Sequence, residues 1–205
     1  MSTSDPMTTS PDALVIPGRE CGTCSLCCKV YTIPELDKPA GKWCKHCLPG
    51  KGICKIHDDL PAGCAAFNCR WRTEEAMPPH WKPDVAKMVV TVNPRNGYIY
   101  VRVDPGTPSA WRKEPYYDEL RQLARNNLES RIYVVVSLND TFTLVLPDLD
   151  VPLKPQGPID RIVVSKRPGA DGARYDVAVN PDPPAGSAGA NAATVSEVAA
   201  EPVGR

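Results

Sequence analysis

Nine cysteines carry the chemistry that can be recognised in this 205-residue sequence, and all of them lie between Cys21 and Cys69. So local an excess indicates a site and not a drift in composition. Two cysteines separated by two residues can turn both thiolates toward one ion. We therefore predict that the metal ligands come from the whole set, namely Cys21, Cys24, Cys27, Cys28, Cys44, Cys47, Cys54, Cys64 and Cys69.

Disulfide bonding is the competing interpretation of the same cysteines. The first 20 residues, MSTSDPMTTSPDALVIPGRE, lack a basic start followed by an apolar core, so no secretory signal is recognisable. We expect a cytoplasmic protein, and thiols in that compartment are kept reduced. An odd number of cysteines also argues against a fully paired disulfide set. Metal ligation is therefore the preferred interpretation.

The spacing Cys21-x2-Cys24-x19-Cys44-x2-Cys47 is typical of a four-cysteine zinc site. The five other thiols are enough for a second site with one to spare. Cys27 and Cys28 are adjacent, and neighbouring side chains rarely chelate one ion comfortably. We expect either that one of them serves each of two centres or that one is not a ligand.

Iron–sulfur ligation competes with zinc, because clusters are also held by thiolates. A ferredoxin-type run begins with Cys21, Cys24 and Cys27, but Tyr31 stands where the fourth cysteine is expected. Spacing does not separate zinc from iron. Among the nitrogen ligands, His57 follows Cys54 by three residues and is a weaker candidate than the thiols. We assign neither His46 nor His80 to the site.

Charge limits the classes of partner. Lys and Arg together number 24, as do Asp and Glu, so the formal net charge is zero. A free-standing nucleic-acid binder is usually basic, so nucleic acid is disfavoured. No run of 18 apolar residues exists, and we expect no membrane partner. Lysines between the cysteines either compensate thiolate charge or form a solvated loop; they are Lys29, Lys42, Lys45, Lys51 and Lys55.

The organisation along the chain predicts an α+β fold. We expect a disordered N-terminus (1–18), an irregular cysteine-rich region stapled by metal (19–83), a small α+β module (84–180) and a flexible Pro/Ala/Gly-rich tail (181–205). The module is predicted to be one small antiparallel sheet with one helix against it. The helix is expected over 114–130, and the strands over 86–92, 97–103, 131–138, 141–147, 160–167 and 174–180.

The cysteine motifs resemble those of the YkgJ-like family of bacterial proteins. The resemblance rests on CxxCxxCC followed by WCKHC, GICKIH and GCAAFNCRW, all within residues 19–72, and VDPGTPSAWRKEPYY continues it downstream. It departs at DDLPAGC (58–64), where members commonly carry Arg-Pro before the cysteine. The resemblance implies a zinc- or iron-chelating domain. Its implied ligands are Cys21, Cys24, Cys27, Cys28, Cys44 or Cys47, Cys54, Cys64 and Cys69.

Three functions follow as hypotheses. The first is a metal-binding protein that chelates zinc or iron, with an iron–sulfur cluster as one form of the iron. The second is a cluster-dependent enzyme or redox protein, because flagellin lysine N-methylases contain a similar cysteine cluster; Cys27, Cys28 or a spare thiol would be reactive. No Gly-rich loop for S-adenosylmethionine supports that activity here. The third is a zinc-ribbon-like adaptor, whose protein partner the sequence does not identify.

Overall fold

The fold is described from a computed structural model, which describes residues 14–169, 172–180 and 196–198. The chain divides into two compact units. Unit 1 comprises residues 1–91 and 102–110, and unit 2 comprises 92–101 and 111–205. Most of the predicted N-terminal and C-terminal disordered segments lie outside the described residues.

Unit 1 contains every cysteine, and its elements are short. They are α1 (Cys27–Val30), η2 (Pro34–Leu36), β1 (Cys47–Leu48), β2 (Ile53–Cys54), η3 (His57–Asp59), α2 (Ala62–Ala65), α3 (Arg70–Thr73), η4 (Pro79–Trp81) and α4 (Pro83–Ala86). No cysteine-rich element exceeds four residues, because Gly and Pro interrupt the region and apolar residues do not repeat periodically. Turns and loops must therefore position the thiols.

A five-stranded sheet has the order β3-β4-β5-β6-β7, and the boundary between the two units falls within β3 and β4. The strands β5, β6 and β7 pair antiparallel in register, as Val135↔Leu144↔Val151 shows. Their bounds are β3 (Met88–Val92), β4 (Ile99–Val103), β5 (Val134–Leu138), β6 (Thr141–Val145) and β7 (Asp150–Leu153). These elements, with the helices, confirm the predicted α+β class.

Helix α5 (Tyr116–Asn127) is the longest helix in the described residues, and it lies within the predicted range 114–130. It buries Leu120 and Ala124, which are four positions apart and so lie on one face of the helix. The short helix η5 (Ala110–Arg112) precedes it in the chain. The periodic spacing of apolar residues was thus enough to predict this helix.

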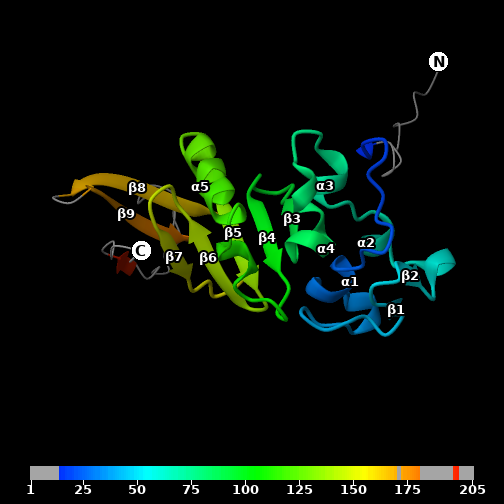
Figure 1. The fold of residues 1–205 in the computed structure, drawn as a ribbon. Helices are drawn as coiled ribbons and strands as arrows, with labels where there is room; N and C mark the ends of the chain where they lie inside the picture. The colour runs from blue at the N-terminus through cyan, green and yellow to red at the C-terminus, as the bar shows by residue number, and fades with distance from the viewer. Residues whose placement is uncertain (1–13, 170–171, 181–195, 199–205) are drawn as a thin grey trace, which may run out of the picture. The chain divides into compact units, whose positions relative to one another are not determined.

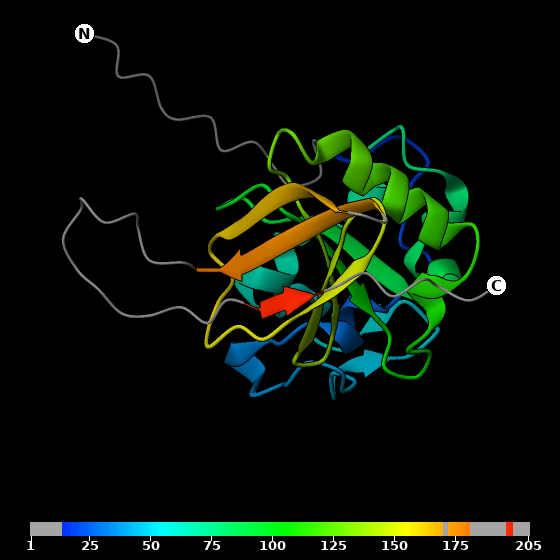
Figure 2. The same cartoon turned by 90° about the vertical axis from the view of Figure 1, so that its left-hand side faces the viewer.

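The predicted strands 160–167 and 174–180 are present as β8 (Ile162–Gly169) and β9 (Gly172–Val179), but they do not extend the five-stranded sheet. They form a separate antiparallel hairpin, seen as the two long orange ribbons in Figures 1 and 2. Its buried Ile162, Tyr175 and Val177 join the same apolar core as Leu144 and Val151. The prediction of a single sheet was therefore wrong, because one face of the hairpin packs on the core instead of pairing at its edge.

A short strand, β10 (Ser196–Val198), pairs antiparallel with β9. It falls inside the segment 181–205, which the sequence predicts to be a flexible tail and most of which lies outside the described residues. A strand edge offers unpaired backbone N–H and C=O groups that a passing segment can satisfy. Within the described part of the chain, no helix is long and apolar enough to cross a membrane.

Candidate metal centre

The nine cysteines are all free thiols, and they gather in two groups within unit 1. The first thiol group is Cys21, Cys24 and Cys69, which interact electrostatically, with Cys24 packed against the cluster that contains Cys69. The second thiol group is Cys28, Cys44, Cys47 and Cys64, with Cys27 and Cys54 beside it. The sequence predicts which cysteines are candidate ligands, and the structure shows which of them lie near one another.

This sorting differs from the four-cysteine site predicted from spacing. That site joined Cys21 and Cys24 to Cys44 and Cys47, but the two pairs belong to different groups. A backbone contact explains the outcome, since the N–H of Cys44 donates to the carbonyl of Cys28 at 3.0 Å. The second CxxC pair is thereby attached to α1 and not to the first pair.

In the first thiol group, the loop that begins at Cys21 presents Cys24 to backbone donors. The N–H of Cys24 donates to the carbonyl of Cys21 at 2.9 Å, and Gly22 takes a φ of +55° that closes this turn. The Cys24 sulfur accepts hydrogen bonds from the backbone N–H groups of Leu26 and Asp84. Burial nevertheless raises the pKa of Cys24 above its ordinary value.

Cys69 completes this group from the start of α3. It is buried and directly precedes Arg70, the first residue of the helix. Its sulfur accepts hydrogen bonds from the backbone N–H groups of Arg72 and Trp71, while burial raises its pKa. Backbone N–H groups aimed at sulfur favour the thiolate form that a metal ion needs.

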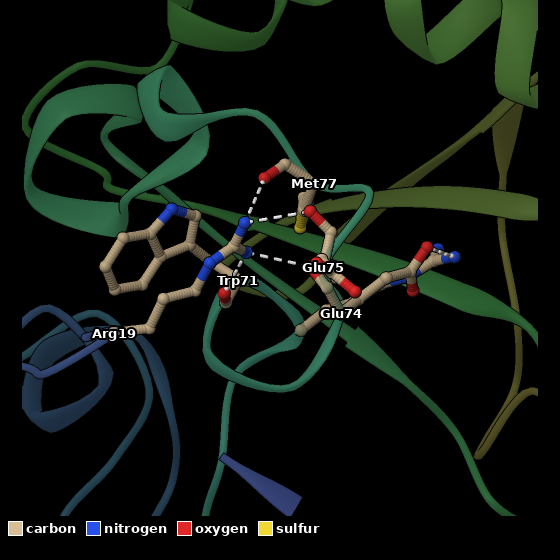
Figure 3. A network of polar contacts seen from close by, with 6 residues as sticks. Arg19, Trp71, Glu74, Glu75 and Met77 are labelled. Carbon is tan, nitrogen blue, oxygen red and sulfur yellow. Dashed lines mark hydrogen bonds and ion pairs between the residues drawn. The ribbon is translucent and has the colours of Figure 1, made fainter. Parts of the chain in front are cut away.

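One arginine fastens the loop before Cys21 to the segment after Cys69. The Arg19 guanidinium donates to the backbone carbonyls of Trp71 (2.6 Å), Glu74 (2.7 Å), Glu75 (2.9 Å) and Met77 (2.9 Å). Figure 3 shows the guanidinium pointing into this ring of carbonyl oxygens beside the Trp71 indole. Since the planar fork offers five N–H donors, one side chain satisfies four carbonyls that would otherwise need water.

The second thiol group is assembled by a hairpin. In the β1–β2 pair, Cys47 lies opposite Cys54, so both fall on the same face. The Ser25 hydroxyl interacts with the Cys47 thiol and accepts the N–H of Gly50 at 3.2 Å. Ser25 thus joins the CxxCxxCC loop to the hairpin turn.

The thiols of the second group interact closely. The Cys28 thiol is in hydrogen-bond contact with those of Cys27 and Cys47. The Cys27 contact and then burial raise the pKa of Cys28 strongly. Burial first, and then Cys28, raises the pKa of Cys47 to about 11, and burial also raises the pKa of Cys64. These groups are protonated thiols at neutral pH in the absence of an ion.

Lys38, which is outside the predicted ligands and the lysines discussed with them, lies among these thiols. Lys38 is 5% exposed, and its ammonium donates to the carbonyls of Lys29 (2.8 Å) and Tyr31. Burial lowers the pKa of Lys38, while Cys28 and Cys44 act in the opposite direction. Thiolate compensation and a solvated loop were both open for five other lysines. Of these, Lys29 is paired with Asp104. The other four are exposed, as in a solvated loop: Lys42, Lys45, Lys51 and Lys55.

The loops of the two thiol groups meet at a glycine. A β-carbon placed on Gly52, whose φ is +65°, would lie 1.8 Å from the carbonyl oxygen of Gly22. No other residue type fits this approach without displacing backbone. The CxxC loop of the first group therefore rests directly on the hairpin that carries Cys47 and Cys54.

Histidines contribute little to either group. The His57 side chain is 79% exposed in η3 and lies 3.9 Å from the Asp58 carboxylate. His80 stacks loosely beside Trp81, with ring centroids 6.3 Å apart. Among residues 14–169, 172–180 and 196–198, no three His, Cys, Asp or Glu side chains already converge as they do round a bound ion. The thiols are thus grouped by the fold without already forming such a set.

The donor set fits a cation of intermediate softness. Thiolates prefer zinc and iron–sulfur centres over magnesium or calcium. Cys24 and Cys69 each have two backbone N–H donors, and the second group has a buried ammonium that offsets thiolate charge. Comparison with protein-family models, curated proteins and solved structures gives no match.

Proposed function

We propose that this chain is a metal-binding protein whose clustered thiols hold zinc or iron, the iron either as an ion or in an iron–sulfur cluster. The supporting observation is the sorting of the cysteines into two groups inside one unit. Nine thiols in a segment without a continuous apolar core need a reason to gather, and metal ligation supplies the folding energy.

This proposal agrees with the zinc- or iron-chelating domain that the resemblance to the YkgJ-like family implies. It includes a cytoplasmic location, where thiols stay reduced. Two centres fit the donor count. Each takes up metal in exchange for thiol protons, because the thiolate is the ligand. The raised pKa values of Cys24, Cys47 and Cys69 mean that these protons are present until metal displaces them.

The enzyme and redox alternatives need a reactive thiolate. A nucleophilic cysteine has a lowered pKa and partial exposure. Cys28 is one of the reactive candidates, but its pKa is raised by Cys27 and by burial. The metal-binding function is therefore preferred over thiol catalysis at this position.

The deciding experiment is elemental analysis with a visible spectrum on the full chain purified without oxygen. About two zinc ions per chain in a colourless protein would indicate closed tetrahedral sites. Brown protein with iron and labile sulfide would indicate a cluster. Metal-free protein that binds neither on reconstitution contradicts the proposal.

A matched pair of variants separates ligation from folding. Cys47→Ser removes a thiol of the second group, whereas Leu48→Ser changes the next residue of β1, which is 37% exposed. We expect loss of metal from Cys47→Ser alone. Equal metal content in both variants would exclude Cys47 as a ligand.

A further inference from the structure

The first thiol group is one ligand short. It contains three thiols, Cys21, Cys24 and Cys69, whereas a tetrahedral ion takes four donors. The other cysteines belong to the second group or lie beside it. The fourth donor has to come from another residue type near Cys24.

Asp84, in the first turn of α4, lies at this place. Its backbone N–H donates to the Cys24 sulfur, and its carboxylate acts electrostatically on the same thiol. The Lys82 ammonium lies near both the Cys21–Cys24 loop and Asp84. A β-carbon on Gly22 would lie 3.9 Å from this ammonium. The ammonium is 3.8 Å from the Asp84 carboxylate. The carboxylate and the Cys21–Cys24 loop are therefore neighbours.

One oxygen of this carboxylate lacks a partner. Oδ2 faces Lys82, but Oδ1 is buried and has no hydrogen bond to any described residue. Leaving a buried acceptor unsatisfied is unfavourable, and more so for a charged group. A cation at the first thiol group would satisfy this oxygen.

We propose that Asp84 is the fourth ligand of the ion at the first thiol group, which makes that centre a mixed site of three sulfurs and one oxygen. The inference rests on the metal-binding function proposed above. Three thiolates, one carboxylate and a divalent ion sum to −2, and the cations of Arg19 and Lys82 lie over the Trp71 ring nearby. The second thiol group, in contrast, provides thiolates alone.

The mixed site of the first thiol group and the all-thiolate site of the second differ in how firmly they hold an ion. A carboxylate oxygen is a harder donor than a thiolate and suits zinc or iron(II) less well than sulfur does. The ion at the first thiol group is therefore the more exchangeable of the two. Cys21 is exposed, so its side chain can rotate inward to close the site.

Cobalt(II) tests this assignment, because its visible absorption reports the number of thiolates bound to it. Metal-free full-length protein is titrated with Co²⁺ alone, in the wild type and in Asp84→Asn, Asp84→Cys and Asp58→Asn variants. Asp58 is fully exposed and serves as the matched control. Far-UV circular dichroism of each variant verifies the fold.

We expect the wild type to bind two ions, and Asp84→Asn to bind one of them at least tenfold more weakly. Asp84→Cys should increase the thiolate-to-cobalt charge-transfer absorption, and Asp58→Asn should match the wild type. Two ions bound with unchanged affinity and unchanged spectra in both Asp84 variants would overturn the inference while leaving metal binding intact. Failure of the wild type to bind any Co²⁺ would overturn both proposals.

Discussion

At the scale of single residues, the most informative side chain is that of Lys38, which the cysteine motifs do not predict to be part of the site. Lys38 is buried among the thiols of the second group, and its ammonium is held by two backbone carbonyls. A buried cation is tolerated only with compensation. In the proposed metal-bound state, thiolates provide this compensation, so the lysine and the bound centre stabilise each other.

We therefore predict that Lys38→Met weakens metal binding at the second thiol group by about tenfold or more. Two unit charges about 4 Å apart near a protein surface interact by roughly 4 kcal/mol, and tenfold requires about 1.4 kcal/mol. Competition with a chelator measures the affinity. Lys42→Met, at an exposed lysine of the same segment, is the control. Equal affinities of both variants and the wild type would refute a role for the Lys38 charge.

A tyrosine in unit 2 gives a prediction about pH that does not involve metal. The Tyr175 hydroxyl donates to the Asp148 carboxylate at 3.0 Å, and burial with this contact raises the pKa of Tyr175 from 10.0 to about 12. The folded chain thus keeps a proton that the unfolded chain loses above pH 10. The stability contributed is complete below pH 10 and is lost as the pH rises toward 12.

The loss amounts to at most about 2.7 kcal/mol, since each pH unit between the two pKa values is worth about 1.4 kcal/mol. Urea unfolding at pH 9, 10 and 11 measures it through the free energy of unfolding. Tyr175→Phe should flatten this pH dependence. A variant whose stability falls as steeply as that of the wild type would rule out Tyr175 as the titrating group.

At the scale of elements, the contact of two loops decides whether the thiol groups form. Gly50 and Gly52 both have a positive φ in the β1–β2 turn, but only Gly52 approaches the Gly22 carbonyl. We predict that Gly52→Ala loses about 1–3 kcal/mol more stability than Gly50→Ala and retains less metal. Both variants include the strain of a left-handed side chain, about 1–2 kcal/mol.

Urea unfolding and metal content per chain, measured on both glycine variants, test this prediction. Gly50 is a close control because a β-carbon there meets nothing within 4 Å, and its N–H to Ser25 is kept. Indistinguishable variants would show that the loops can separate without consequence. The contact would then have no part in holding the thiols.

The helices and strands also show which parts of the fold could be predicted from the sequence. Strands and the long helix were predictable because their apolar residues repeat with a period, as in β4 and α5. Strand β7 was missed because it is short and contains Pro152. The sorting of the thiols was not predictable, since CxxC spacing says which cysteines share a turn and not which turns meet.

Lys38 and Asp84 were missed for a related reason. Burial of a charged side chain is decided by distant contacts, and neither residue stands in a motif. The only local signal was the position of Asp84 after Lys82 and Pro83, at the start of a helical turn. Nothing in that pattern predicts an orphaned carboxylate oxygen beside a thiol.

At the scale of the whole molecule, every thiol belongs to unit 1, while unit 2 has an apolar core of its own. That core contains no cysteine and includes Leu144, Val151 and Tyr175. We predict that a chelator raises hydrogen exchange throughout residues 21–69 and leaves β5 and β6 protected. On the proposed function, unit 1 depends on bound ions for its stability, whereas burial of apolar surface stabilises unit 2.

Hydrogen exchange followed by mass spectrometry, with and without chelator, checks this prediction peptide by peptide. Restoring zinc should restore protection in unit 1 and serves as the reversal control. Uniform loss of protection across β5, β6 and the cysteine region would mean that the two units unfold as one.

The Arg19 contacts bear on the order in which ions arrive. The guanidinium ties the chain before Cys21 to four carbonyls between Trp71 and Met77. Two cysteine-bearing segments about fifty residues apart in sequence are thus tied together by a side chain that is not itself a candidate ligand. These four hydrogen bonds offset part of the entropy of closing that long loop, which leaves less of it for the proposed ion to offset. In the proposed metal-bound state, inward rotation of the exposed Cys21 side chain and release of the thiol protons are the steps left to the ion.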